Sequence, residues 1–215
     1  MLNFILDLLF PPVCGFCDQI SKDYLCENCK EKLKKLEKFE IIKYQNNEKY
    51  FNKHIYIYEY KELIREILIK YKFKQKSYIH KTLVENIIKN KKICRILKNY
   101  DIIISVPIHT ERRLKRGYDQ SYLIAKELSK KLNIKTYKNV LIKTVNNKPQ
   151  SSLKKYERLE NVVNAYKIKN IEVNLNKKIL LLDDIYTTGN TVDECSKILK
   201  NAGAKEVGIL TIAKD

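Results

Sequence analysis

Several residue types and segments are scarce or missing in this chain of 215 residues. It has no tryptophan and only 5 glycines, where average usage would give about fifteen, so a glycine at a turn is informative. Its strongest apolar run, LNFILDLLF (2–10), is interrupted by Asn3 and Asp7 and stopped by Pro11 and Pro12 after nine residues, whereas a membrane span takes about twenty. The start also lacks the basic residues and cleavage site of a secretory signal. We therefore expect a cytoplasmic protein without a membrane span, in which 2–10 forms a short amphipathic helix.

Acidic residues are outnumbered by basic ones. The chain has 43 Lys and Arg against 25 Asp and Glu, which gives a formal net charge of +18. Such an excess indicates a polyanionic partner, either nucleic acid or a phosphorylated metabolite. A surface of solvated lysines would give the same total, so the charge alone does not decide between the two interpretations.

Four of the six cysteines fall within sixteen residues, in the spacing C-x2-C-x8-C-x2-C. Thiolates separated by two residues on a tight turn can face one ion, and two such turns supply the tetrahedral four-sulfur set that zinc prefers. Disulfides are the alternative, which a reducing cytosol disfavours. Because four protein ligands leave no open position, the zinc would be structural. The predicted ligands are Cys14, Cys17, Cys26 and Cys29.

Strand-like and helix-like segments alternate from residue 101 to the end of the chain. The strand-like segments are continuous apolar runs, which are typical of a parallel sheet covered on both faces. We therefore predict an α/β fold over 39–215, an open, mostly parallel sheet with helices on both faces, behind an N-terminal helix and zinc knuckle over 1–38. The predicted strands are 54–60, 101–107, 139–144, 178–183 and 207–213, and the predicted helices are 62–73, 78–93, 120–132 and 191–202, with 29–40 as a charged helical tail or linker.

The segment LLLDDIYTTGNT (180–191) joins a predicted strand to a predicted helix. Backbone N–H groups and hydroxyls converge at a helix N-terminus, where the dipole favours an anion. The spacing matches neither the Walker loop nor G-x-G-x-x-G. Two carboxylates would repel a bare nucleotide phosphate, but they can accept hydrogen bonds from hydroxyls. The pattern favours a ligand that carries a phosphate beside hydroxyls; an ordinary helix cap after a strand is the alternative.

Two further segments are predicted to lie beyond the carboxyl ends of strands, where open α/β folds bind ligands. The first carries a cluster of guanidinium groups suited to a diphosphate or a nucleic acid backbone, with a solvated basic turn as the alternative. The second is the polar stretch 145–161, and loops of this length are lids, binding loops or disordered segments. The residues concerned are Arg112, Arg113 and Arg116 in the first segment, and Gln150 and Arg158 in the second.

The segment 180–191 resembles the signature of type I phosphoribosyltransferases, which consists of three apolar residues, two acids and a T-G-x-T phosphate loop. With the cysteine knuckle after LLFPP, the segment SVPIHTERRLKRGYDQS and the segment KPQSSLKKYERLENVVNAY, the whole chain is similar to the ComF family. The resemblance implies the type I phosphoribosyltransferase fold, a role in natural competence, and phosphoribosyl diphosphate with Mg2+ as the ligand. It also implies single-stranded DNA and competence-machinery proteins as partners.

The resemblance also assigns roles to individual residues. Asp183 and Asp184 would hold the ribose 2′- and 3′-hydroxyls, Mg2+ would be carried mainly by the ligand, and the stretch 145–161 would close over the bound sugar. The arginine cluster would meet the diphosphate or DNA. The 5-phosphate would be cradled by Thr187, Thr188, Gly189, Asn190 and Thr191.

Three functions stay open from the sequence. The chain is an active phosphoribosyltransferase on an unknown acceptor in nucleotide metabolism, a factor for incoming single-stranded DNA that uses the site for binding or regulation, or a zinc-bearing interaction module. The intact Asp183 and Asp184 argue against the third. Purine-salvage enzymes carry an acid where this chain has Thr187, so the catalytic residues stay unassigned and the second function is favoured.

Overall fold

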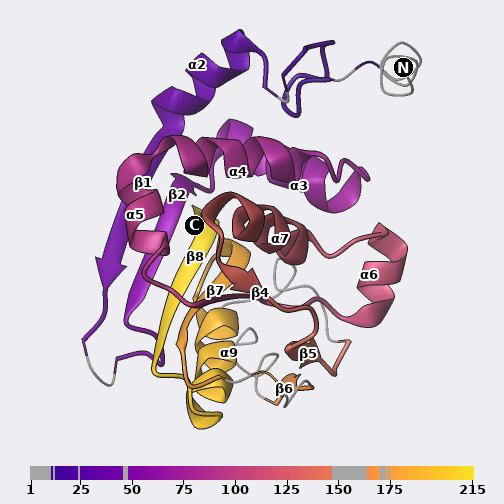
Figure 1. Ribbon diagram of the computed structural model, residues 1–215. Coiled ribbons are helices and arrows are strands. Elements are labelled where there is room, and N and C mark those ends of the chain that lie inside the picture. The colour runs from indigo at the N-terminus through magenta and orange to yellow at the C-terminus, as the bar shows by residue number, and fades with distance from the viewer. Residues whose placement is uncertain are drawn as a thin grey trace.

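The computed structural model describes residues 11, 13–23, 25–45, 48–146, 164–169, 173 and 175–215. Figure 1 shows how the helices and strands of this part are arranged. The strands are β1 (Glu37–Lys43), β2 (Lys53–Glu59), β3 (Ile102–Ser105), β4 (Lys135–Thr136), β5 (Leu141–Lys143), β6 (Tyr166–Ile168), β7 (Lys178–Tyr186) and β8 (Glu206–Lys214). The helices are α2 (Glu27–Leu36), α3 (Glu62–Phe73), α4 (Ile79–Lys89), α5 (Lys91–Leu97), α6 (Thr110–Arg116), α7 (Gln120–Leu132) and α9 (Asn190–Asn201).

Six of these strands form one sheet in the order β1-β2-β8-β7-β3-β4. Only β1 and β2 pair antiparallel, and the other neighbours are parallel. A separate antiparallel ribbon joins β5 to β6. The predicted α/β fold with a mostly parallel sheet is therefore confirmed.

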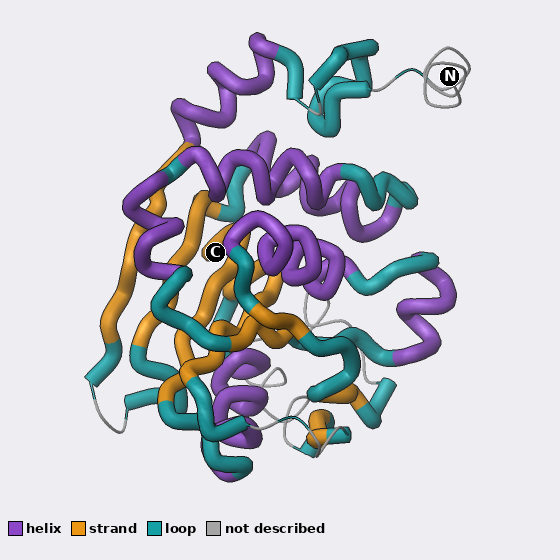
Figure 2. Tube along the Cα trace, in the orientation of Figure 1, coloured by secondary structure: helices purple, strands orange, loops and turns teal. Residues whose placement is uncertain are grey.

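Alternate residues of the central strand β7 pack into two separate cores. Leu180 and Leu182 pack with α3, α4 and α7 on one face of the sheet. Ile179 and Leu181 pack with α9 on the other face. Figure 2 shows the strands as a layer between these helices. Burial on both faces explains why the central strands are continuous apolar runs in the sequence.

The edge of the sheet differs from the sequence prediction. The charged segment 29–40, expected as a helical tail or linker, is helical only as far as Leu36, and β1 begins at Glu37. Pairing with β2 overrides the helical composition, because Glu40 and Ile41 pair with Tyr56 and Ile55 of that strand. Edge pairing supplies backbone hydrogen bonds that outweigh a weak local propensity.

Two other boundaries also differ from the prediction. The helix expected over 78–93 is interrupted at Asn90, whose side chain accepts a hydrogen bond from the N–H of Ile93 at 3.0 Å and so starts a new helix, α5. Asparagine is a favoured N-cap, which explains the break. The basic segment after β3, expected as a loop, contains the seven-residue helix α6.

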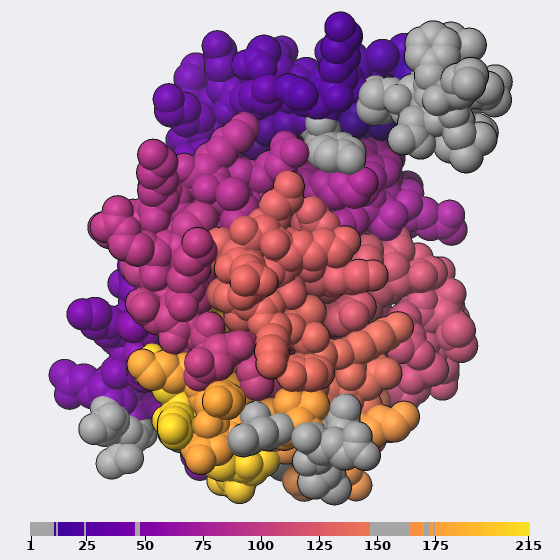
Figure 3. All heavy atoms as spheres, viewed as in Figure 1, coloured from indigo at the N-terminus to yellow at the C-terminus, as the bar shows by residue number. Residues whose placement is uncertain are grey.

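The N-terminal part lies at one end of the molecule, against the helices that follow β2 (Figure 3). Residues 2–10, predicted as an amphipathic helix, lie outside the described residues. Within the described ranges, none of the helices has the length and apolar character to cross a membrane. The division at residue 38 stays a prediction; α2 gives way to β1 between Leu36 and Glu37.

Candidate ligand-binding cleft

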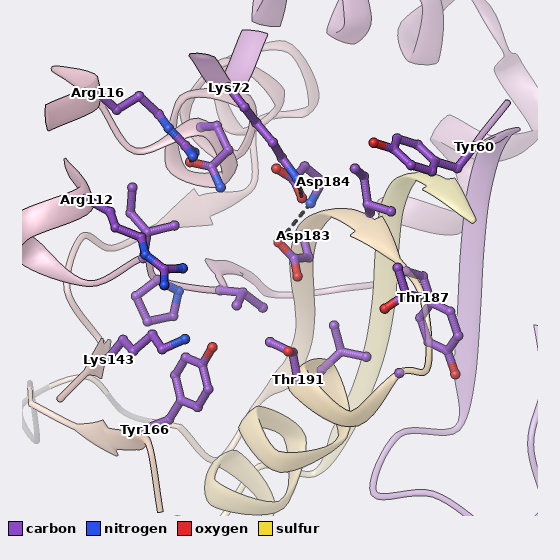
Figure 4. A pocket seen from close by; sticks show the side chains of 18 of the residues that line it. Tyr60, Lys72, Arg112, Arg116, Lys143, Tyr166, Asp183, Asp184, Thr187 and Thr191 are labelled. Atoms are coloured by element: carbon purple, nitrogen blue, oxygen red, sulfur yellow. Dashed lines mark hydrogen bonds and ion pairs between the residues drawn. The ribbon is translucent and has the colours of Figure 1, made fainter. Parts of the chain in front are cut away.

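A cleft of about 230 Å³ opens beyond the carboxyl ends of β3 and β7. Figure 4 shows arginine and lysine side chains on one side of it, two carboxylates at its centre, and threonines of the β7–α9 loop on another side. The polar and aromatic residues that line it include Tyr60, Lys72, Phe73, Arg112, Arg116, Gln120, Lys143, Tyr166, Asp183, Asp184, Tyr186, Thr187 and Thr191, with Gly189.

The two carboxylates near the end of β7 are held differently. Asp183 Oδ1 accepts hydrogen bonds from the Ser121 hydroxyl at 3.1 Å and from the Asp184 N–H at 2.9 Å. Asp184 Oδ1 pairs with Lys72 Nζ at 3.0 Å, whereas its buried Oδ2 has no hydrogen-bond partner among the described residues. Burial, and then the Asp184 carboxylate, raise the pKa of Asp183 to about 7. The pair therefore offers acceptor oxygens that suit neutral hydroxyl groups of a ligand.

The loop after β7 is built around one glycine in a left-handed conformation. Gly189 has φ +79° and precedes the first residue of α9. A Cβ at this position would lie 2.2 Å from the Tyr186 hydroxyl oxygen, so the tyrosine ring packs directly against the loop backbone. Thr187 and Thr191 line the cleft, and the buried Thr188 hydroxyl has no partner in the described part of the chain. The loop therefore combines hydroxyl groups with the start of a helix, an arrangement that is suited to an anion.

Tyr186 is itself fixed from behind by two aromatic residues. The His54 ring stacks on it at 4.2 Å between centroids, and the Tyr44 and Tyr186 hydroxyl oxygens lie 3.5 Å apart. His54 Nε2 lies 2.8 Å from the Thr211 hydroxyl oxygen. Burial, and then nearby Lys214, lower the pKa of His54 to about 3, so this ring supports the loop as a neutral group.

The structure brings two of the three predicted arginines to the cleft. Arg112 and Arg116 are four residues apart on α6 and both line it. Arg113 lines a separate small hollow with Asp119 and Lys138. Successive residues of a helix are rotated by about 100°, whereas residues four apart share a face.

Arg116 is held in place from two directions. It donates a hydrogen bond to Gln120 Oε1, and its guanidinium carbon lies 5.4 Å from the centre of the Phe73 ring. Burial lowers its pKa. A guanidinium fixed in this way is preorganised for a planar anion such as a phosphate oxygen pair.

Sequence reasoning missed two lysines of the cleft. Lys72 comes from α3 and Lys143 from β5. Burial, and then the neighbouring Arg112, lower the pKa of Lys143, whose Nζ lies 5.3 Å from the centre of the Tyr166 ring. Since 43 residues are Lys or Arg, no local pattern distinguishes these two from the lysines of the surface.

The predicted lid residues Gln150 and Arg158 lie outside the described residues. The flanks of that stretch are described: β5 pairs with β6, and the Thr144 N–H donates to the Ala165 carbonyl at 2.9 Å. Lys143 and Tyr166, on either side, both line the cleft. The described residues on either side of that stretch therefore lie beside the candidate site.

The four N-terminal cysteines form a second candidate site. The sulfur atoms of Cys14, Cys17, Cys26 and Cys29 all lie within 4.8 Å of one another, and all four are free thiols. Cys17 Sγ and Cys26 Sγ are 3.7 Å apart, close to the roughly 3.8 Å that tetrahedral Zn–S bonds of about 2.3 Å require. The donor set fits one structural zinc ion.

Two family profiles match parts of this chain. The family profile of the phosphoribosyl transferase domain matches residues 119–215, and that of the double zinc ribbon domain matches residues 5–39. Residues 5–39 contain four cysteines and no histidine, which is enough for one zinc ion of the four-ligand kind.

Several curated proteins are similar in sequence. Competence protein F of Haemophilus influenzae is 28% identical over 210 residues, which cover 94% of this chain and 85% of that protein. Competence protein ComFC of Streptococcus pneumoniae is 29% identical over 161 residues, 75% of this chain and 68% of that protein. DNA utilization protein YhgH of Escherichia coli is 31% identical over 114 residues, 53% of this chain and 49% of that protein.

Solved structures include one of glutamine phosphoribosylpyrophosphate amidotransferase from Bacillus subtilis. It superposes with a TM-score of 0.42 and 19% identity, over 63% of this chain and 26% of that chain.

Proposed function

The chain belongs to the ComF family, with a phosphoribosyltransferase-like domain behind a zinc ribbon, and from this premise we propose that it binds phosphoribosyl diphosphate and acts in natural competence. In this proposal it works in the cytoplasm on incoming single-stranded DNA, and the cleft holds the sugar diphosphate for binding or regulation. One observation carries the proposal: the adjacent Asp183 and Asp184 share a cleft with the hydroxyl-rich loop at the start of α9.

The two ends of such a ligand match the two kinds of group in the cleft. Ribose hydroxyls donate to carboxylates, and Asp184 Oδ2 is an acceptor without a partner among the described residues. The 5-phosphate accepts hydrogen bonds from the hydroxyls and N–H groups of the loop that Gly189 keeps open. A phosphate without a sugar would not use the carboxylates, and a sugar without a phosphate would not use the loop.

The charge of the cleft supports a ligand with more than one phosphate. Among the described residues, its lining has four cationic side chains and two carboxylates, and burial raises the pKa of the Asp183 carboxyl. The excess of positive charge suits a diphosphate, which guanidinium and ammonium groups bind well. The cations are Lys72, Arg112, Arg116 and Lys143.

The residues present also fit Mg2+ bound together with the ligand. Hard oxygen donors suit this ion, which keeps several waters and uses few protein ligands, and the Asp183 and Asp184 carboxylates would hold it directly or through water. When bound, Mg2+ neutralises charge on a departing diphosphate. The chain's own part is to orient the sugar through Asp183 and Asp184 and the diphosphate through the cations.

Active transfer to an acceptor is the second candidate function. Tyr60, Ile69 and Phe73 also line the cleft, and Figure 4 shows Tyr60 on the far side of the carboxylates from Arg112 and Lys143. An aromatic ring such as that of Tyr60 suits a planar acceptor. Thr187 offers no general base, so the acceptor would have to lose its proton to another group or to water.

DNA handling is supported by the names of the relatives and by the net charge of +18. Lysines lie over tyrosine rings outside the cleft as well as in it: Lys138 Nζ is 5.6 Å from the Tyr122 centroid, and Lys197 Nζ is 5.8 Å from that of Tyr50. Aromatic and cationic side chains together bind single strands by stacking and phosphate contacts.

Calorimetric titration of Mg2+ and phosphoribosyl diphosphate tests the ligand. Asp183→Ala combined with Asp184→Ala should abolish saturable binding, because both hydroxyl acceptors are removed. Asp101→Ala is the matched control, since Asp101 lies at the opposite end of β7 and accepts the Lys178 N–H at 2.9 Å. Unchanged affinity in the double variant would show that the assignment of the site is wrong. Transfer to an acceptor needs a separate experiment. A panel of nucleobases and amines is added to the protein with phosphoribosyl diphosphate and Mg2+, and the release of pyrophosphate is measured.

Salt dependence tests the DNA proposal and separates the arginines. Removal of one side chain that binds a phosphate should reduce the slope of log affinity against log salt by about 0.7 for a single strand. If DNA binds to the outside of α6, Arg113→Ala lowers the slope and leaves phosphoribosyl diphosphate affinity unchanged, whereas Arg112→Ala and Arg116→Ala weaken the small ligand. Absence of single-stranded DNA binding at low salt would refute this part of the proposal.

A further inference from the structure

The C-terminal end of α3 is tied to the four-cysteine knuckle through one acidic residue. Asp18 Oδ2 lies 3.7 Å from Lys70 Nζ and also pairs with Lys76, while Asp18 Oδ1 accepts a hydrogen bond from the Tyr78 hydroxyl at 3.1 Å. Lys70 Nζ also donates to the carbonyl oxygen of Phe16 at 3.0 Å. Three side chains from residues 70–78 therefore converge on one aspartate of the knuckle.

The position of Asp18 is set by the loop that carries the cysteines. It follows Cys17 directly and has φ +63°, a left-handed backbone conformation that residues other than glycine adopt at a cost. Its N–H donates to the Cys14 carbonyl at 3.1 Å, and the Cys14 N–H donates to the Gln19 carbonyl at 2.8 Å. A metal ion on Cys14 and Cys17 would fix this turn, and with it the direction of the Asp18 carboxylate.

The same end of α3 also reaches the ligand cleft. Lys72 Nζ pairs with Asp184 Oδ1 at 3.0 Å, and the Phe73 ring lies under the Arg116 guanidinium. Residues 70 and 72 are two positions apart in a helix and so point to opposite sides. One helical turn thus contacts the knuckle on one side and two candidate ligand-binding groups on the other.

We propose that Asp18 is a positioning residue for the cleft: it holds residues 70–78 against the metal-loaded knuckle and thereby fixes Lys72 and Phe73 beside Asp184 and Arg116. Metal binding in the knuckle and ligand binding in the cleft then stabilise one another. The identity of the ligand rests on the proposed function, whereas the link between the knuckle and α3 does not. Because the Asp18 pairs are partly exposed to solvent, the coupling lies at the low end of the usual range, about fivefold in affinity.

Asp18→Asn is the variant that tests this role. Asparagine tolerates the left-handed backbone and removes only the charge that Lys70 and Lys76 face. Asp23→Asn is the matched control, with the same change of charge in the same knuckle, because Asp23 pairs with Lys30 of α2 at 3.0 Å. Both zinc-loaded proteins are compared with wild type in zinc content, in hydrogen exchange of the amides of residues 70–73, and in affinity for phosphoribosyl diphosphate with Mg2+.

The expected result is one zinc per chain in all three proteins, with faster exchange at 70–73 and about fivefold weaker binding only in Asp18→Asn. Reciprocally, a chromogenic chelator should take zinc from the wild type more slowly when phosphoribosyl diphosphate and Mg2+ are bound in the cleft. A merely structural contact would not produce this difference in rate. Exchange at 70–73 equal to wild type overturns the positioning role. A wild type that binds no phosphoribosyl diphosphate refutes the proposed function instead, and the exchange data still decide this inference. Should Asp18→Asn lose its zinc, Lys70→Met with Lys76→Met gives the same test without altering the knuckle.

Discussion

An alanine at position 189 would strain the phosphate loop in two ways. The backbone there has φ +79°, and a left-handed conformation costs an L-residue about 1–2 kcal/mol. The new methyl group would also lie 2.2 Å from the Tyr186 hydroxyl oxygen and 2.5 Å from the ring carbon that bears it. The ring cannot move away freely, because the His54 ring stacks on it at 4.2 Å between centroids.

The chain contains a control that carries only the first of these two costs. Gly203 has φ +98°, and a Cβ there would meet nothing within 4 Å. Gly203→Ala should lower the free energy of unfolding by about 1–2 kcal/mol. Gly189→Ala adds overpacking, for which about 1–3 kcal/mol is typical, so its loss should be about 2–5 kcal/mol.

Urea unfolding followed by far-ultraviolet circular dichroism measures both variants against wild type. A loss for Gly189→Ala that exceeds that of Gly203→Ala by at least about 1 kcal/mol supports the packing of Tyr186 on the loop. Equal losses would refute the reasoning, because they would mean that the ring leaves the loop at no cost. Binding of phosphoribosyl diphosphate should weaken in Gly189→Ala and stay at the wild-type level in Gly203→Ala.

Three further predictions concern the carboxylates, α3 and the knuckle. Because the folded pKa of Asp183 is raised from 3.8 to about 7, the folded protein binds this proton more tightly, so the free energy of unfolding falls as pH rises from about 4 to about 7. Asp183→Asn should flatten that decline in urea midpoints taken across this range, and an unchanged profile would contradict the shift. Tyr71→Phe removes the buried hydrogen bond from the Tyr71 hydroxyl to the Gln120 carbonyl, 2.7 Å long, and should cost about 1 kcal/mol; a cost near zero in urea unfolding would contradict it. Removal of zinc by a chelator should loosen the knuckle and leave the sheet folded, and global loss of circular dichroism would show that the core depends on the metal.

Elements with a strong local pattern were predicted closely. The expected helices 62–73 and 120–132 have the observed bounds of α3 and α7, because each presents an apolar stripe at helical spacing. The strand at 178–183 is observed as the longer β7, Lys178–Tyr186. Where a neighbouring strand or a capping side chain decided the structure, as at β1 and Asn90, the helix expected from the local pattern ran past its observed end.

The sequence by itself determined the features whose parts are contiguous. Two acids, a glycine and hydroxyls within 183–191 must lie together at one strand end, and four cysteines within sixteen residues can close on one ion. A short stretch of chain keeps such groups near one another in any fold that preserves its turns.

Only the tertiary structure decided which distant cations join them. Lys72 lies 111 positions before Asp183 in the chain, yet α3 packs on the sheet face that brings it to Asp184. The direction of α6 turns Arg112 and Arg116 into the cleft and Arg113 away from it. Such convergence depends on the order of the strands and on which face of the sheet each helix covers. The packing of the whole core sets both, so no local sequence pattern predicts them.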